Sequence, residues 1–61
     1  MNKYERTYRI VIRLDDNKTD LVFISSARNM QIAGEVAARY ALIAALEEDS
    51  NFARVLRIEE I

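Results

Sequence analysis

Three strand patterns and one helix pattern follow one another in the order strand, strand, helix, strand, and they occupy almost the whole chain of 61 residues. Residues 4–14 alternate between apolar and polar side chains, which is typical of a strand with one buried face. The Asp- and Asn-containing segment 15–18 predicts a turn, and a second strand follows at about 19–25. These patterns predict the α+β class: a single ββαβ domain over residues 1–61, with a three-stranded sheet and one helix packed on one face.

The first two strands differ in how their side chains divide between faces. The apolar face of the first strand is predicted to hold Tyr4, Tyr8, Ile10, Ile12 and Leu14. The wet face is predicted to hold Glu5, Thr7, Arg9, Val11 and Arg13. The second strand contains a continuous apolar run at 21–24, so both of its faces are expected to be covered, and this is a first indication of a partner.

The helix pattern extends from about residue 29 to residue 48, and only Gly34 interrupts it. Ser26 or Asn29 can cap its N-terminus, because either side chain can accept a backbone N–H. At about 100° per residue, an apolar stripe should face the sheet. That predicted stripe consists of Ile32, Val36, Tyr40 and Ile43, flanked by Ala33, Ala37 and Ala44.

The last strand is expected at about 52–61, with Leu56 and Ile58 on one face and Val55, Arg57 and Glu59 on the other. Its neighbour in the sheet stays open at this point. If it pairs with the second strand, it is parallel and the helix is a right-handed crossover. If it pairs with the first strand, the sheet is all antiparallel.

Chain length and composition favour self-association. A single domain of 61 residues has a marginal core, and such domains usually need disulfides, a metal or oligomerisation. The chain has no Cys and no His, which leaves oligomerisation. Two leucines lie one turn apart on the helix side away from the predicted stripe, among small residues that allow close approach. We therefore predict a homodimer with a helix seam at Leu42, Leu46, Ala38 and Ala45.

Composition also argues against catalysis. The carboxylates lie in turns and at element ends rather than paired on a buried face, and neither a Gly-rich phosphate loop nor a nucleophile–base pair is present. We expect no enzyme activity, no cofactor and no metal.

No apolar run is long enough to span a membrane, and the first residues lack an apolar signal core, so we expect a cytoplasmic protein, in the host cytoplasm if the chain is phage-encoded.

Acidic residues cluster at three places. Glu47, Glu48 and Asp49 end the helix, where the macrodipole makes each carboxylate cost roughly 0.3–1 kcal/mol, so helix stability does not explain them. The other clusters are Asp15, Asp16 and Asp20, and Glu59 with Glu60. The functional interpretation is a surface that imitates phosphates and engages a basic cleft. The alternative is a solvated helix end and loops, with Arg54 or Arg57 pairing locally.

A basic sheet face is the second candidate surface. Arg9 and Arg13 project from the wet face of the first strand, and Arg57 can join them. Arginine contacts to phosphates would make this face a nucleic-acid platform. The alternative is cross-strand pairing with Glu5 and Glu59. Because the formal net charge is −1 and no exposed aromatic pair is evident, we do not expect nucleic-acid binding to be the main role.

The strand at 7–14, the Asp-rich turn at 15–18 and the final segment 55–61 resemble, in layout, the small dimeric uracil-DNA glycosylase inhibitors of podophages that infect Bacillus. The resemblance implies two paired helices whose groove captures an apolar loop of the enzyme, while carboxylates take the place of DNA phosphates. Glu35, Val36 and Tyr40 are similar in type to helix residues of that family. Gly34 stands where the family has an aromatic residue beside the acid.

A second resemblance is to the ββαβ module of the archaeal ribosomal LX family. It rests on segment 24–27 leading into an Ala-rich helix and on segment 57–61. That family is basic and binds rRNA, whereas this chain is slightly acidic.

The sequence therefore predicts a small homodimeric inhibitor of a DNA-processing enzyme, and the most specific target that it indicates is uracil-DNA glycosylase. The acidic residues Glu47, Glu48 and Asp49 would supply charge complementarity. Met30, Val36 and Tyr40 would line an apolar pocket near the paired helices, with Glu35 at its rim. Val36 and Tyr40 are also assigned to the core, and they cannot fully serve both roles. The alternatives are the nucleic-acid-binding module and an assembly or scaffold protein.

Overall fold

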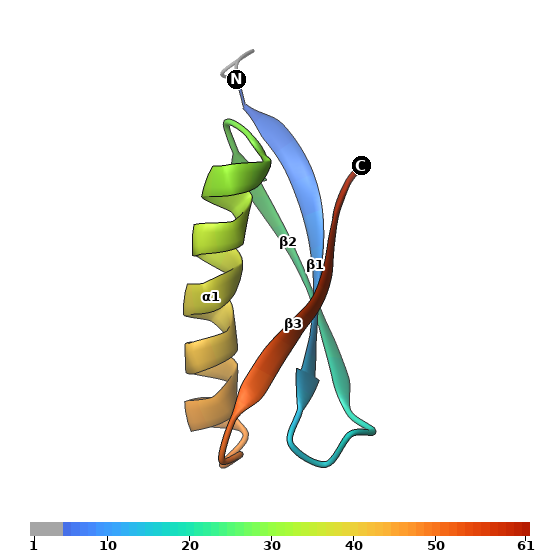
Figure 1. The fold of residues 1–61 in the computed structure, drawn as a ribbon, viewed down its shortest axis with the longest axis vertical. Helices are drawn as coiled ribbons and strands as arrows, with labels where there is room; N and C mark the ends of the chain where they lie inside the picture. The colour runs from blue at the N-terminus through green and yellow to red at the C-terminus, as the bar shows by residue number, and fades with distance from the viewer. Residues whose placement is uncertain (1–4) are drawn as a thin grey trace.

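The structure, a computed structural model, describes residues 5–61 and confirms the predicted α+β class. Its elements, in chain order, are β1 (Arg6–Leu14), β2 (Asp20–Ala27), α1 (Met30–Glu47) and β3 (Ala53–Glu60). Figure 1 shows α1 running along one side of a single twisted sheet. Tyr4, which was predicted to extend the apolar face of the first strand, lies outside the described residues.

The strand order is β2-β1-β3, and both pairings are antiparallel. The last strand therefore pairs with the first, which decides between the two arrangements that the sequence leaves open. Ile10 lies opposite Phe23 of β2 and opposite Ile58 of β3. Because β1 is the central strand, it supplies the middle of the core, while β2 and β3 are the two edges of the sheet.

The alternation in β1 gives the two faces that the sequence predicts. Its buried side chains on the helix side are Tyr8, Ile10, Ile12 and Leu14. The opposite side, which α1 does not cover, is called the open sheet face here. Val11 lies on that face and is nevertheless only 4% exposed, because Val22 and Arg57 stand directly opposite it on the two neighbouring strands.

The helix packs on the sheet mainly through alanines, with Val36 and Tyr40 of the predicted stripe half-buried against the core. Its buried residues are Ala33, Ala37, Ala41, Ala44 and Ala45. Ile32 and Ile43 are 40% and 48% exposed, so their assignment to the sheet-facing stripe was wrong. The large side chains of β1 already fill the space between the layers, and small residues let the helix approach closely.

Both ends of α1 are capped. Asn29 is the N-cap, and its side-chain oxygen accepts the N–H of Ile32 at 2.9 Å. At the other end the N–H of Ser50 donates to the carbonyl of Ala45 at 2.8 Å, and Asp49 adopts the left-handed conformation with φ of 52°. This is a Schellman-type ending in which an aspartate stands where glycine is usual.

A β-bulge in β3 changes which of its side chains face the helix. Val11 pairs with Arg57 but Ile12 pairs with Val55, so Leu56 is the extra residue. As a result Val55 and Ile58 both pack against the core, while Leu56 lies on the open sheet face and is 37% exposed. The prediction that Leu56 and Ile58 share a face was therefore wrong.

Among the described residues, no helix combines the length and apolar composition needed to cross a bilayer.

Candidate functional site

The side of α1 that faces away from the sheet carries an exposed apolar patch. Leu42 and Leu46, which lie one turn apart, are 66% and 76% exposed. We use the name outer helix surface for Glu35, Ala38, Arg39, Leu42, Ile43 and Leu46. Scattered surface leucines are common, but here three large apolar side chains lie together on the last two turns of one helix.

A run of carboxylates adjoins this surface. Glu47, Glu48 and Asp49 are exposed and form what we call the acidic helix end. Within residues 5–61, no hydrogen bond or ion pair engages their carboxylates, and the same is true of Glu35. These four carboxylates are thus available to a partner without the loss of an existing pair.

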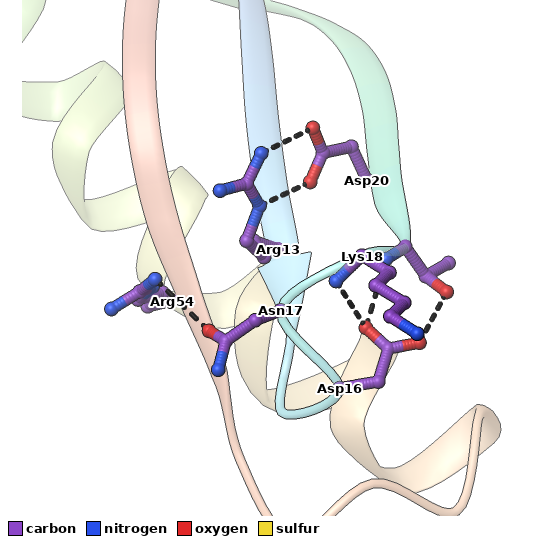
Figure 2. A network of polar contacts seen from close by, with 7 residues as sticks. Arg13, Asp16, Asn17, Lys18, Asp20 and Arg54 are labelled. Atoms are coloured by element: carbon purple, nitrogen blue, oxygen red, sulfur yellow. Dashed lines mark hydrogen bonds and ion pairs between the residues drawn. The ribbon is translucent and has the colours of Figure 1, made fainter.

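The carboxylates of the hairpin turn have a different role, since the fold uses them internally. Asp16 accepts the backbone N–H groups of Lys18 and Thr19, each at 2.8 Å, and also the hydroxyl of Thr19 (Figure 2). These hydrogen bonds, the Thr19 hydroxyl foremost, lower the pKa of Asp16 to about 2. The turn that the sequence predicts at 15–18 is therefore built by Asp16.

Asp15 joins this turn to the loop that follows the helix. Its carboxylate accepts the N–H of Asn51 at 2.8 Å, and its own N–H donates to the hydroxyl of Ser50 at 3.2 Å. The hydrogen bond from Asn51 is the main reason that the pKa of Asp15 is lowered. Asp15 and Asp16 therefore hold the fold together at one end and do not belong to the surface that we consider for binding.

These lowered pKa values predict acid sensitivity. The folded-state pKa of Asp16 is about 2, below the value of about 3.9 for an unperturbed Asp, so its contribution to stability is present above pH 4 and is lost as the pH falls toward 2. We expect the free energy of unfolding, measured by urea denaturation, to fall between pH 5 and pH 2.5. The fall should be smaller for Asp16→Asn, and Thr19→Val should lie between this variant and the wild type. Identical pH profiles for all three proteins would contradict this role of Asp16.

The arginines of the open sheet face are paired with carboxylates. Arg13 binds Asp20 through two hydrogen bonds, of 2.7 and 3.0 Å, and this contact raises the pKa of Arg13 and lowers that of Asp20 (Figure 2). The Glu59 carboxylate oxygen Oε1 lies 2.9 Å from Nε of Arg57 and 3.9 Å from a terminal guanidinium nitrogen of Arg9. Cross-strand pairing, the alternative to a nucleic-acid platform, is therefore present between Arg9 and Glu59 and between Arg13 and Asp20, with Asp20 in place of the expected Glu5.

A positive excess remains on this face all the same. Arg54, which donates a hydrogen bond to the side-chain oxygen of Asn17 at 3.1 Å, is the fourth arginine there (Figure 2). Within the three strands, the open sheet face sets two carboxylates, those of Asp20 and Glu59, against these four arginines. Glu5, which precedes β1, forms no ion pair within residues 5–61. The molecule thus carries excess positive charge on the sheet side and excess negative charge on the helix side.

The residues predicted to bind a partner are divided between two sides of the helix. Val36 and Tyr40 are half-buried against the core, and the Tyr40 ring stacks on that of Phe23 with 4.9 Å between centroids. Ala45 is also buried, on the sheet side, whereas Ala38 is exposed. The prediction of a seam at Ala38, Leu42, Ala45 and Leu46 stays untested, although Ala45 is not on the exposed side with the other three.

The predicted apolar pocket is not formed by one copy of residues 5–61, where no pocket is found. Met30 is 49% exposed at the start of the helix, and Glu35 is exposed on the outer helix surface. Such a pocket would need a second chain. Within residues 5–61 no group of carboxylates has a metal-binding arrangement.

Sequence reasoning missed three contributors to the exposed surfaces. Ile43, assigned to the core, lies on the outer helix surface, and its exposure follows from the alanine packing of the helix. Val22 and Ile24 are 58% and 56% exposed on the open sheet face. The continuous apolar run at 21–24 was the signal for them.

Comparison of the chain with protein-family models, with curated proteins and with solved structures found no match.

Proposed function

We propose that this protein is a small inhibitor that binds a DNA-processing enzyme through its outer helix surface and acidic helix end. The observation that carries the proposal is the exposed pair Leu42 and Leu46 beside four carboxylates that have no partner among the described residues. An apolar centre with a charged border is the usual composition of a protein-binding surface. The charge is negative, which fits a partner with a basic site.

The electrostatics favour an enzyme that grips nucleic acid. From residue 30 to residue 49 the chain has four carboxylates, on Glu35, Glu47, Glu48 and Asp49, and one cation, Arg39. Enzymes that act on DNA bind phosphates with Lys and Arg, so their clefts attract such a surface and would accelerate its association. The acidic helix end lies at the negative end of the macrodipole, which adds to the negative potential at that position.

The leucines would supply much of the binding energy. Full burial of a leucine stabilises a complex by roughly 1.5–3 kcal/mol, so the pair can contribute severalfold more than the surrounding ion pairs at the exposed border. Uracil-DNA glycosylase is the most specific target we propose, on the layout resemblance to its phage inhibitors. The second candidate, a nucleic-acid-binding module, is favoured by one observation, the excess of two arginines among the strand residues of the open sheet face.

The test is a uracil-excision assay titrated with the purified protein. We expect a stoichiometric loss of glycosylase activity. Neutralising the acidic helix end with Glu47→Gln, Glu48→Gln and Asp49→Asn should slow association by about tenfold or more at low salt, because charge steering mainly affects the on-rate. Glu5→Gln, which removes an exposed carboxylate outside the helix, is the matched control and should leave the rate unchanged.

Full glycosylase activity at a large molar excess of the protein would remove that target. A pull-down from bacterial lysate, followed by an activity assay of the captured enzyme, then decides the broader class. Inhibition of another nuclease or repair enzyme would keep the proposal with a different target. Salt-sensitive retardation of DNA or RNA by the protein alone would instead support the nucleic-acid-binding module.

A further inference from the structure

The two edges of the sheet differ in how well they are protected from pairing. β3 contains a bulge and four charged side chains, those of Arg54, Arg57, Glu59 and Glu60, and both features block the addition of another strand. β2 has neither a bulge nor a proline. Its one charged residue, Asp20, is its first residue and is neutralised by Arg13. Within residues 5–61, no other segment pairs with the outer edge of β2.

The hydrogen bonds at the ends of β1 define the free backbone groups of β2. The N–H of Leu14 donates to Thr19 at 3.0 Å, and the N–H of Ile61 donates to Thr7 on the other side at 2.9 Å. Even-numbered residues of β1 therefore bond to β2, and they stand opposite its odd-numbered residues. The even-numbered residues of β2, above all Val22 and Ile24, direct their N–H and C=O groups toward the open edge.

We propose that a second copy of this chain covers this edge, pairing β2 with β2 in antiparallel orientation to form one six-stranded sheet. A two-fold axis at Phe23 places Val22 opposite Ile24 of the second copy, and each pair exchanges the free backbone hydrogen bonds. The same register sets Asp20 opposite Ser26 of the second copy, so no like charges face each other within β2. The strand is thus complementary to itself.

Phe23 favours this register over its neighbours. Its ring is half-buried on the helix side and stacks on Tyr40. At a non-hydrogen-bonded position on the axis, the two Phe23 side chains would be in direct contact, since such pairs have Cα atoms about 4.5 Å apart. The two Phe23–Tyr40 stacks would then join into one aromatic cluster. A register centred on Val22 or Ile24 would separate them.

Charge explains why a second copy fits the strand better than the helix. The outer helix surface itself is balanced, with Glu35 and Arg39, but it adjoins the acidic helix end. A seam between two helices would therefore add the three carboxylates of each acidic helix end to the interface, and like charges across an interface are unfavourable. The β2 edge is uncharged apart from the neutralised Asp20. Pairing there leaves both outer helix surfaces free, and this inference does not depend on which target they bind.

Sedimentation equilibrium tests the proposal, with Ile24→Pro as the decisive variant. The N–H of Ile24 faces the free edge, so proline there removes no bond to β1 but blocks pairing with a second copy. We expect a wild-type dimer and a dissociation constant raised at least about a hundredfold, because the symmetric dimer carries the change twice. Ile24→Thr, which keeps the N–H, is the matched control. Circular dichroism shows whether the Ile24→Pro variant is folded. If it is unfolded, the dissociation constant of Ile24→Lys, which changes an exposed side chain, decides whether the dimer forms at β2.

The register has its own test, because the chain contains no cysteine. Under oxidising conditions Phe23→Cys should form an intermolecular disulfide, whereas Val22→Cys and Ile24→Cys should not, since only a residue on the axis meets its own copy. A wild-type protein that is monomeric at high micromolar concentration would overturn the proposal. A dimer that persists in both Ile24→Pro and Ile24→Lys would overturn it as well, and preferential cross-linking at 22 or 24 would overturn the register.

Discussion

Replacing Ile12 with alanine should destabilise the domain by about 2–5 kcal/mol, which is most of the stability expected for a chain of this size. Ile12 is 0% exposed on the central strand, opposite Leu21 of β2 and Val55 of β3. The helix covers it with alanines, and short side chains cannot move in to fill the space that the substitution leaves. The cost therefore includes both the lost burial and the cavity.

Urea denaturation at a fixed protein concentration would measure this loss, because the dimer that we propose makes stability depend on concentration. Ile43→Ala is the matched control: the same atoms are removed from a side chain that is 48% exposed, and we expect a change within about 0.5 kcal/mol. Similar losses for the two variants would mean that Ile43 is buried and that the helix is rotated relative to the structure described here.

The fold was predictable where a local pattern was sufficient. The strict alternation in β1 predicted its buried face, since neighbouring side chains of a strand point in opposite directions. The cap at Asn29 and the turn at Asp16 were also predictable in kind, because both depend on residues a few positions away. In each case the sequence window that determines the structure is short.

The helix orientation and the β3 bulge could not be read in the same way. Hydrophobic periodicity assigns Ile32 and Ile43 to the sheet-facing side of the helix because they are more apolar than alanine. The contact between helix and sheet is instead determined by the volume left above the large side chains of β1. The bulge at Leu56 arises from the pairing of β3 with β1, which lies more than 40 residues away in the chain. Asp15 likewise bonds Asn51 across 36 positions. No local pattern carries such information.

The candidate surfaces were partly predictable from composition. The position of Leu42 and Leu46 on the outer side of the helix followed from helical periodicity, and the carboxylates at 47–49 from the sequence itself. The structure adds that the turn carboxylates are engaged internally while those of the acidic helix end have no partner among residues 5–61. It also distinguishes an open β2 edge from a protected β3 edge, which depends on the strand order.

A double substitution, Leu42→Asp with Leu46→Asp, should abolish target binding and leave the dimer intact. Both side chains are more than 60% exposed, so the fold should tolerate the change. Loss of two buried leucines should weaken the complex by about 10²–10⁴-fold, from roughly 1.5–3 kcal/mol for each. The added negative charges match the sign of the surface, so electrostatic attraction to a basic target cannot account for the loss. Gln31→Asp adds an exposed charge to the same helix without removing a leucine, and serves as the control.

Sedimentation velocity of this double variant mixed with the target enzyme tests both surfaces in one run. We expect the variant to sediment as a dimer and the enzyme to sediment alone, whereas the wild type and Gln31→Asp should both sediment with the enzyme. A complex that forms as well as that of the wild type would show that the outer helix surface does not bind the target. A variant that sediments as a monomer would show that the dimer seam lies along the helix and not at β2.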